Sequence, residues 1–231
     1  MSAISKSDRI TTGLAGLLSG VLSILMVGLY FVYDGAPPPE NVLGRNLITV
    51  TTFIGFLIFG AGLARLLRQA RGGDAGLSGS IAVTSLLTYV AVTLVSASLE
   101  VGTSLWKPNS DMDPTVDGPL AAGMVLLHGP IARGLVAAFL ITLTISAART
   151  GLLRRWVLTG NIILALTNLA LVPSLFFGMN AANFYAANGW GAVASIGLIN
   201  VIWFATLGGA LLRSRAARQT PVPTPAPAPT R

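Results

Sequence analysis

Long runs of apolar residues recur along this chain and are separated by short polar connections. Each run reaches the roughly 20 residues that a helix needs to cross a hydrocarbon core of about 30 Å. The runs are too uniformly apolar for helices with one wet face, and backbone groups in lipid must satisfy one another. The pattern therefore predicts six transmembrane helices, at about 10–33, 47–67, 79–105, 120–148, 156–177 and 190–212.

Composition agrees with an all-α, polytopic membrane protein. The chain has 231 residues, of which 53% are hydrophobic and 10% are charged, whereas about a quarter of a soluble domain is charged. It contains no cysteine, which excludes disulfides, thiolate metal sites and cysteine nucleophiles. Arginine outnumbers lysine, and Ala, Gly and Pro are abundant, as is typical of a GC-rich bacterial genome.

The basic residues alternate between the connections in a way that predicts an orientation. Twelve of the 15 Lys and Arg residues fall in the two tails and in the second-to-third and fourth-to-fifth connections. Arg45 and Lys107 fall on the opposite side, and Arg133 falls within a span. Because basic loops stay in the cytoplasm, both termini are predicted to be cytoplasmic, in the inner membrane of a bacterium. The net charge of +7 then reflects the orientation of the chain in the membrane. This origin favours membrane lipids as partners and argues against binding to nucleic acid.

The two tails differ in composition. Residues 1–9 form a short basic N-tail, and residues 10–213 form the six-helix domain. Residues 214–231 include proline at every second position from Pro221 to Pro229, which predicts an extended or disordered cytoplasmic tail.

Two charged residues fall inside predicted spans, where a charge is costly and suggests a function. Arg133 lies 16 residues before Arg149 and Glu100 lies 21 residues after Gly79, or about 24 and 32 Å of helix from one face. Both side chains lean toward their own N-termini, which brings them closer, so we expect a Glu100–Arg133 pair. Three interpretations stay open: a structural salt bridge, a snorkelling arginine with Glu100 at the interface, or a site for a ligand, ion or proton.

The fourth span contains the motif "HGP", formed by His128, Gly129 and Pro130. Proline is tolerated in the first turn of a helix, so this motif is compatible with a helix that begins near Gly129. We favour a break at residues 129–130. Residues 119–127 are then a separate apolar element on the outer surface or a re-entrant one; the alternative is one long, tilted helix interrupted at the motif.

Asparagines form a second polar set. Asn161 and Asn168 share one face of the fifth span, and Asn200 lies at a depth similar to that of Asn168. They are expected to make polar contacts between helices. Gly16 and Gly20 form a small-xxx-small motif, which favours a close helix approach, either internal or between copies.

One segment resembles a known family. The stretch "ARTGLLRRWVLTGNIILAL" (Ala148 to Leu166) resembles the cytoplasmic loop and following helix of a domain-of-unknown-function family of small six-span bacterial membrane proteins. Arg154 stands where that family usually has proline. The resemblance implies a six-span membrane protein and implies no catalytic residues.

No catalytic constellation is evident in the sequence. The "GLSG" motif around Ser78 lacks a nearby base, since the chain has one histidine, and no metal or cofactor motif is present. We therefore expect a non-enzymatic scaffold or partner-binding subunit, acting with a protein partner or as a homo-oligomer. The alternative is a small transporter or channel-like protein that uses Glu100, His128 and Arg133 near the outer face.

Overall fold

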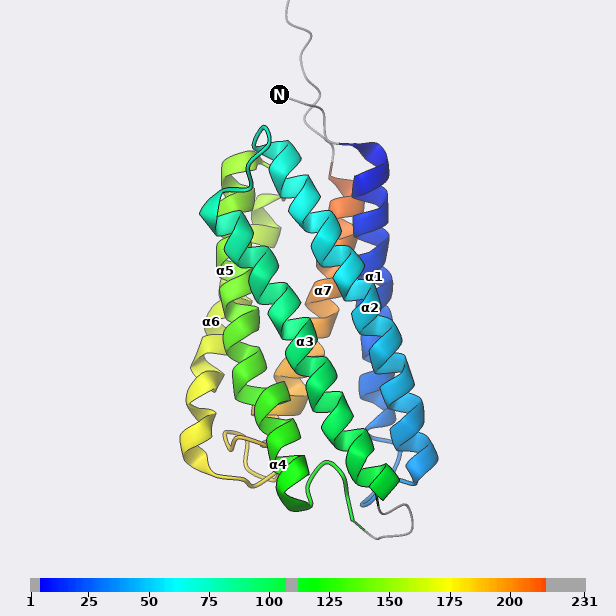
Figure 1. Cartoon of the computed structure of the whole chain (residues 1–231). Coiled ribbons are helices and arrows are strands. Elements are labelled where there is room, and N and C mark those ends of the chain that lie inside the picture. Colours follow the sequence, from blue (N-terminus) through cyan, green and yellow to red (C-terminus); the bar gives the residue numbers. More distant parts are fainter. Residues whose placement is uncertain (1–4, 107–111, 215–231) are drawn as a thin grey trace, which may run out of the picture.

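The computed structural model describes residues 5–106 and 112–214, which form helices and connecting turns without any strand (Figure 1). Six helical segments in this part of the chain are long and apolar enough to cross a membrane. The prediction of an all-α, six-span membrane protein is thus confirmed, while the Pro-rich tail lies outside the described residues. The helical elements are α1 (Lys6–Leu29), α2 (Pro39–Ala70), α3 (Gly76–Trp106), α4 (Gly118–Leu126), η1 (Leu127–Ile131), α5 (Ala132–Thr150), α6 (Arg155–Leu171), η2 (Val172–Phe177), η3 (Gly191–Ser195) and α7 (Ile196–Arg213).

The second span begins earlier than its hydropathy predicts. Helix α2 begins at Pro39, eight residues before the predicted start at Leu47. Proline fits the first position of a helix, where its missing N–H is not needed, and Glu40 lies in the first turn, where the helix dipole favours an acidic residue. As a result Arg45, which hydropathy assigns to a connection, lies within the helix.

The fourth span is one helical segment with a bend in it. Gly129 has φ −87° and ψ −111°, outside the helical region, and Pro130 follows it. The helix is therefore interrupted at residues 129–130 within one long span, which is the alternative arrangement, and not the favoured one with a separate outer element before a helix that begins near Gly129. Helix α4 does not lie on the surface: it packs along α3 and runs on into α5 (Figure 1), and Ser96 Oγ donates a hydrogen bond of 2.9 Å to the Met124 carbonyl.

The connection between the fifth and sixth spans is folded back on itself. It runs from η2 to η3, and Ala187 N donates to the Gly178 carbonyl at 2.9 Å. The rings of Phe184 and Trp190 pack edge to face, with centroids 4.6 Å apart. This segment covers part of one end of the bundle.

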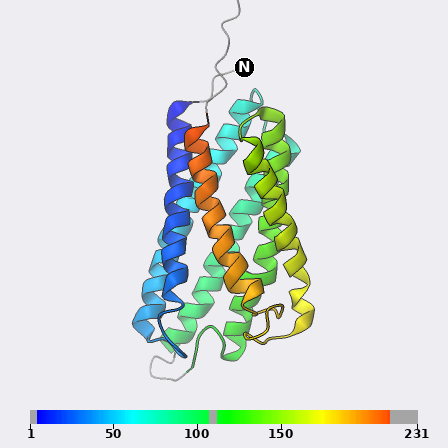
Figure 2. The same cartoon turned by 180° about the vertical axis from the view of Figure 1, so that it is seen from behind.

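Helix α1 packs closely against α2 and α7 (Figures 1 and 2). A Cβ placed on Gly20 would lie 2.6 Å from the Cβ of Ala205, and one placed on Gly16 would lie 2.7 Å from the ring of Phe59. The small-xxx-small motif of α1 therefore serves internal contacts in this chain, which was one of its two predicted uses.

The bundle has two chemically different ends. The start of α1 and the end of α7 lie together (Figure 2), where Arg9 Nη1 donates to the Ser214 carbonyl. We call this the basic end, and the opposite one, with the connections around residues 30–38, 112–117 and 178–190, the distal end. The described basic residues at the basic end are Lys6, Arg9, Arg65, Arg68, Arg71, Arg149, Arg154, Arg155 and Arg213.

The glycines of α7 allow a direct test of the α1–α7 contact. A Cβ on Gly208 would lie 2.7 Å from the Gly13 carbonyl oxygen, whereas nothing lies within 4 Å of one on Gly209. We expect Gly208→Ala to lower the thermal midpoint in detergent, because overpacking costs about 1–3 kcal/mol. Gly209→Ala is the matched control and should raise the midpoint or leave it unchanged, because alanine favours helices by about 1 kcal/mol. Equal midpoints for the two variants would contradict this packing.

Candidate functional site

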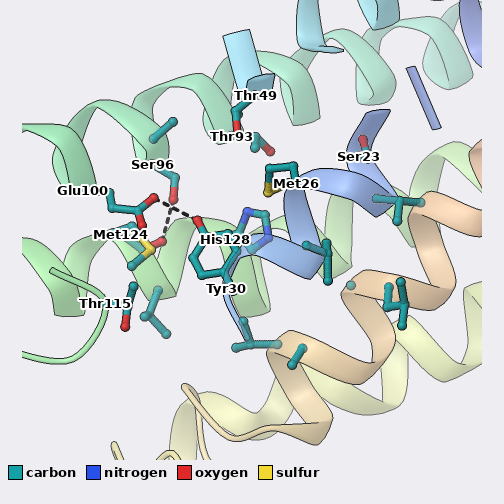
Figure 3. A pocket seen from close by; sticks show the side chains of 18 of the residues that line it. Ser23, Met26, Tyr30, Thr49, Thr93, Ser96, Glu100, Thr115, Met124 and His128 are labelled. Carbon is teal, nitrogen blue, oxygen red and sulfur yellow. Dashed lines mark hydrogen bonds between the residues drawn. The ribbon is translucent and has the colours of Figure 1, made fainter. Parts of the chain in front are cut away.

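A cavity of about 330 Å³ lies in the distal half of the bundle (Figure 3). Its walls come from α1, α2, α3, α4, η1, α5, η3 and α7, and Thr115, Asn188 and Trp190 bring the distal connections to it. Glu100, His128 and Arg133, the three residues of the polar site predicted from the sequence, all line this cavity. They occupy different parts of its wall and have different partners.

Glu100 accepts hydrogen bonds from three side chains on two other segments. Its Oε1 accepts from Arg45 Nη2, with which it forms a salt bridge, and both side chains are 2% exposed. Its Oε2 accepts from Tyr30 Oη at 2.9 Å and from Asn46 Nδ2 at 3.2 Å. A charge buried at this depth is stable only when it is paired and hydrogen-bonded, and Glu100 meets both conditions. These residues, with Asn41, are called the Glu100 cluster below.

Further contacts of Arg45 extend this cluster. The guanidinium carbon of Arg45 lies 4.0 Å from the centroid of the Tyr30 ring, a distance suited to a cation–π contact. Arg45 Nη1 also donates to Asn41 Oδ1 at 3.1 Å, and Asn41 Nδ2 donates to the Leu29 carbonyl at 3.3 Å. The cluster thereby connects the distal end of α1 with α2 and α3.

The predicted Glu100–Arg133 pair is wrong. In the part of the chain that the structure describes, the salt-bridge partner of Glu100 is Arg45. Two features explain the difference. The early start of α2 brings Arg45 into the bundle, and Arg133, which follows the bend at Gly129, directs its guanidinium toward η1 and η3 instead of α3.

Arg133 is held by backbone carbonyls. Its Nε donates to the Ala192 carbonyl at 3.2 Å, and its Nη2 donates to the carbonyls of His128 and Val193 at 3.2 and 3.3 Å. No salt bridge forms to it from any described carboxylate, although the residue is only 2% exposed. Arg133 is therefore an oriented cation in the cavity wall without a described counter-charge.

His128 lines the cavity together with Tyr30 and Met26 (Figure 3). Its carbonyl accepts from Arg133, but its imidazole makes no hydrogen bond with any other described residue. The ring therefore has two nitrogens that can donate to or accept from a molecule in the cavity.

Several other polar atoms of the cavity wall have no described partner. They are Ser23 Oγ, Asn46 Oδ1, Thr93 Oγ1 and Asn188 Oδ1, all with almost no accessible surface. Buried polar groups in proteins are usually hydrogen-bonded to protein or water. Sequence reasoning missed these atoms, which add a polar part to a wall that is otherwise mostly apolar.

Aromatic rings close the cavity toward the basic end. Phe53 and Tyr89 line it, with ring centroids 5.8 Å apart. Phe204 lies 5.8 Å from Tyr89, 5.1 Å from Phe56 and 5.7 Å from Phe139. We call these five residues the aromatic floor. They connect α2, α3, α5 and α7 on the side of the cavity that faces the basic end.

The predicted asparagine contacts lie outside the cavity. Asn168 and Asn200 exchange two hydrogen bonds of 2.9 Å between α6 and α7, in the pairing that their similar depth predicts. Asn161 Oδ1 accepts from Trp203 Nε1 at 2.8 Å, across the same helix pair. These bonds hold α6 against α7.

Metal ligands do not gather anywhere in residues 5–106 or 112–214, where no three His, Cys, Asp or Glu side chains come together. Comparison with family models, curated proteins and solved structures gave no match. The function must therefore be argued from the geometry of the cavity.

Tyr30 offers a test of the Glu100 cluster. We expect Tyr30→Phe to destabilise the protein by about 1 kcal/mol, because it removes one hydrogen bond to a buried carboxylate from a side chain that is still 38% exposed. The measurement is the shift of the thermal midpoint in detergent. Tyr33→Phe is the control, since Tyr33 is exposed and makes no hydrogen bond within the described residues. If both variants melt like the wild type, Tyr30 does not hold Glu100.

Proposed function

We propose that this integral membrane protein binds a small solute in its distal cavity, as a non-enzymatic transporter or channel-like protein. The observation that carries the proposal is that Glu100, His128 and Arg133 line a single cavity bounded by the distal connections. Its volume of about 330 Å³ falls within the roughly 300–1,000 Å³ of ligand pockets. Six apolar helices support membrane insertion.

Because one end of the cavity is closed, the structure favours a transporter that works by alternating access, and it argues against a permanently open pore. Transporters bind their substrates near the bilayer midplane, in a site open to one side at a time. Here the aromatic floor closes the site toward the basic end, and the bend at Gly129 directly follows His128 of the cavity wall. A bend of this kind provides a point about which α4 can move relative to α5.

The orientation belongs to the same proposal. The basic end is assigned to the cytoplasm of a bacterium and the distal end to the outside, because basic residues concentrate at cytoplasmic ends. The solute then reaches the cavity from outside the cell.

The scaffold role that the sequence favoured is now the second candidate. A scaffold needs a rigid bundle with a dry interior, whereas the cavity wall here carries several polar atoms without described partners. Water access to the cavity separates the two functions.

The absence of cysteine makes this access measurable. We expect Ala97→Cys, in the cavity wall on α3, to react with a membrane-impermeant thiosulfonate reagent added to intact cells. Ala82→Cys is the matched control on the same helix, because Ala82 is fully buried and does not line the cavity. It should react at least about tenfold more slowly, since a thiol in a close-packed interior is inaccessible to reagent.

Reaction of Ala97→Cys in inverted vesicles but not in intact cells would contradict the orientation. An Ala97→Cys protein that is folded but as unreactive as Ala82→Cys from both sides would show a dry cavity. That result would overturn solute binding and favour the scaffold.

A further inference from the structure

The charges around the cavity indicate the class of solute, an inference that rests on the proposed function. Among residues 5–106 and 112–214, three ionisable side chains other than tyrosines line the cavity: Glu100, His128 and Arg133. Glu100 is neutralised from behind by Arg45, which does not itself line this cavity. Arg133 has no described carboxylate partner, so Glu100, Arg133 and the Arg45 behind Glu100 together carry one net positive charge.

An arginine without a counter-charge in a membrane span is costly, because its charge loses the solvation that water would give it. Backbone carbonyls reduce this cost for Arg133 but do not neutralise its charge. A ligand with one negative charge would supply the counter-charge that the described protein lacks. Arginine suits this role because its guanidinium donates several hydrogen bonds in one plane to carboxylate or phosphate oxygens.

The contacts of Arg133 leave one edge of its guanidinium free. Nε and Nη2 are used on the carbonyls of His128, Ala192 and Val193. Nη1 has no hydrogen bond to any described residue and is not among the buried atoms without a partner. Because Arg133 lines the cavity, Nη1 is the donor available to a bound anion, held in a fixed direction by the other two nitrogens.

The other residues of the cavity wall indicate what the rest of the ligand is like. Ser23 and Thr93 add small polar side chains to this wall. Most of the other wall residues are apolar, and the volume equals that of about ten water molecules. The apolar wall residues include Met26, Val27, Phe31, Phe53, Ala97 and Val201.

We propose that the cavity binds an organic monoanion: one anionic head group, held by Arg133, on a single short apolar body. A free carboxylate and the head group of an anionic membrane lipid share this head-group chemistry. The cavity volume suits one short chain more than a two-chain lipid, so the free carboxylate is the preferred source.

Octanoate and its neutral amide, octanamide, test the charge requirement with almost the same shape. Binding is measured by calorimetry on the full chain in nanodiscs of phosphatidylcholine. We expect octanoate to bind at least about tenfold more tightly than octanamide, as one charge-assisted hydrogen bond implies. Arg133→Gln should abolish this preference, whereas Arg149→Gln, at an exposed position on the same helix, should keep it.

Each alternative result has a separate meaning. Equal binding of octanoate and octanamide would overturn the anion proposal and leave solute binding intact. Failure of both to bind would overturn the proposed ligand class. The proposed function is tested separately, by the thiol reactivity of Ala97→Cys. If Arg133→Gln fails to fold, the wild-type preference for octanoate over octanamide still decides whether charge is required, and Arg133→Lys tests which residue carries it.

Nanodiscs that contain phosphatidylglycerol distinguish the two sources of the anion. Weaker octanoate binding in these nanodiscs than in phosphatidylcholine alone would support the anion site and identify lipid as its occupant. Unchanged binding would support a free carboxylate.

Discussion

The buried carboxylate of Glu100 is the constraint on which the distal half of the bundle depends. In lipid this charge requires a buried cation and hydrogen-bond donors, and Arg45, Tyr30 and Asn46 supply them from α1 and α2. Satisfying Glu100 therefore fixes how three helices meet at the distal end. The cavity lies beside this junction, where Glu100 also forms part of its wall.

The same pairing determines the chemistry of the cavity. Because Arg45 pairs with Glu100, the charge of Arg133 is not neutralised by that carboxylate. Arg133 instead donates to the carbonyls of η1 and η3. One of those carbonyls belongs to His128, beside the bend at Gly129, and the other two belong to Ala192 and Val193 in η3. The structural ion pair and the proposed anion site thus both follow from the pairing of Glu100 with Arg45.

The sequence predicted the spans well and the partners less well, for physical reasons. Hydropathy locates the middle of a helix because most residues of a membrane span are apolar, but it misses polar helix ends such as residues 39–46. The signal that could have found them was proline followed by glutamate at a helix start. Depth counting placed Asn168 beside Asn200 correctly, because both helices are regular there. It failed for Arg133 because depth gives no direction around the helix axis, and the bend at Gly129 lies one turn away.

Two double-mutant cycles test the central claim, that Glu100 is paired with Arg45 and leaves Arg133 free. One combines Arg45→Met with Glu100→Gln, and the other combines Arg133→Met with Glu100→Gln, with unfolding free energies measured in detergent. The first pair should show a coupling energy of about 0.5–3 kcal/mol, as contacting residues do, and the second should be additive within about 0.5 kcal/mol. Coupling between Glu100 and Arg133, with additivity between Glu100 and Arg45, would contradict the account.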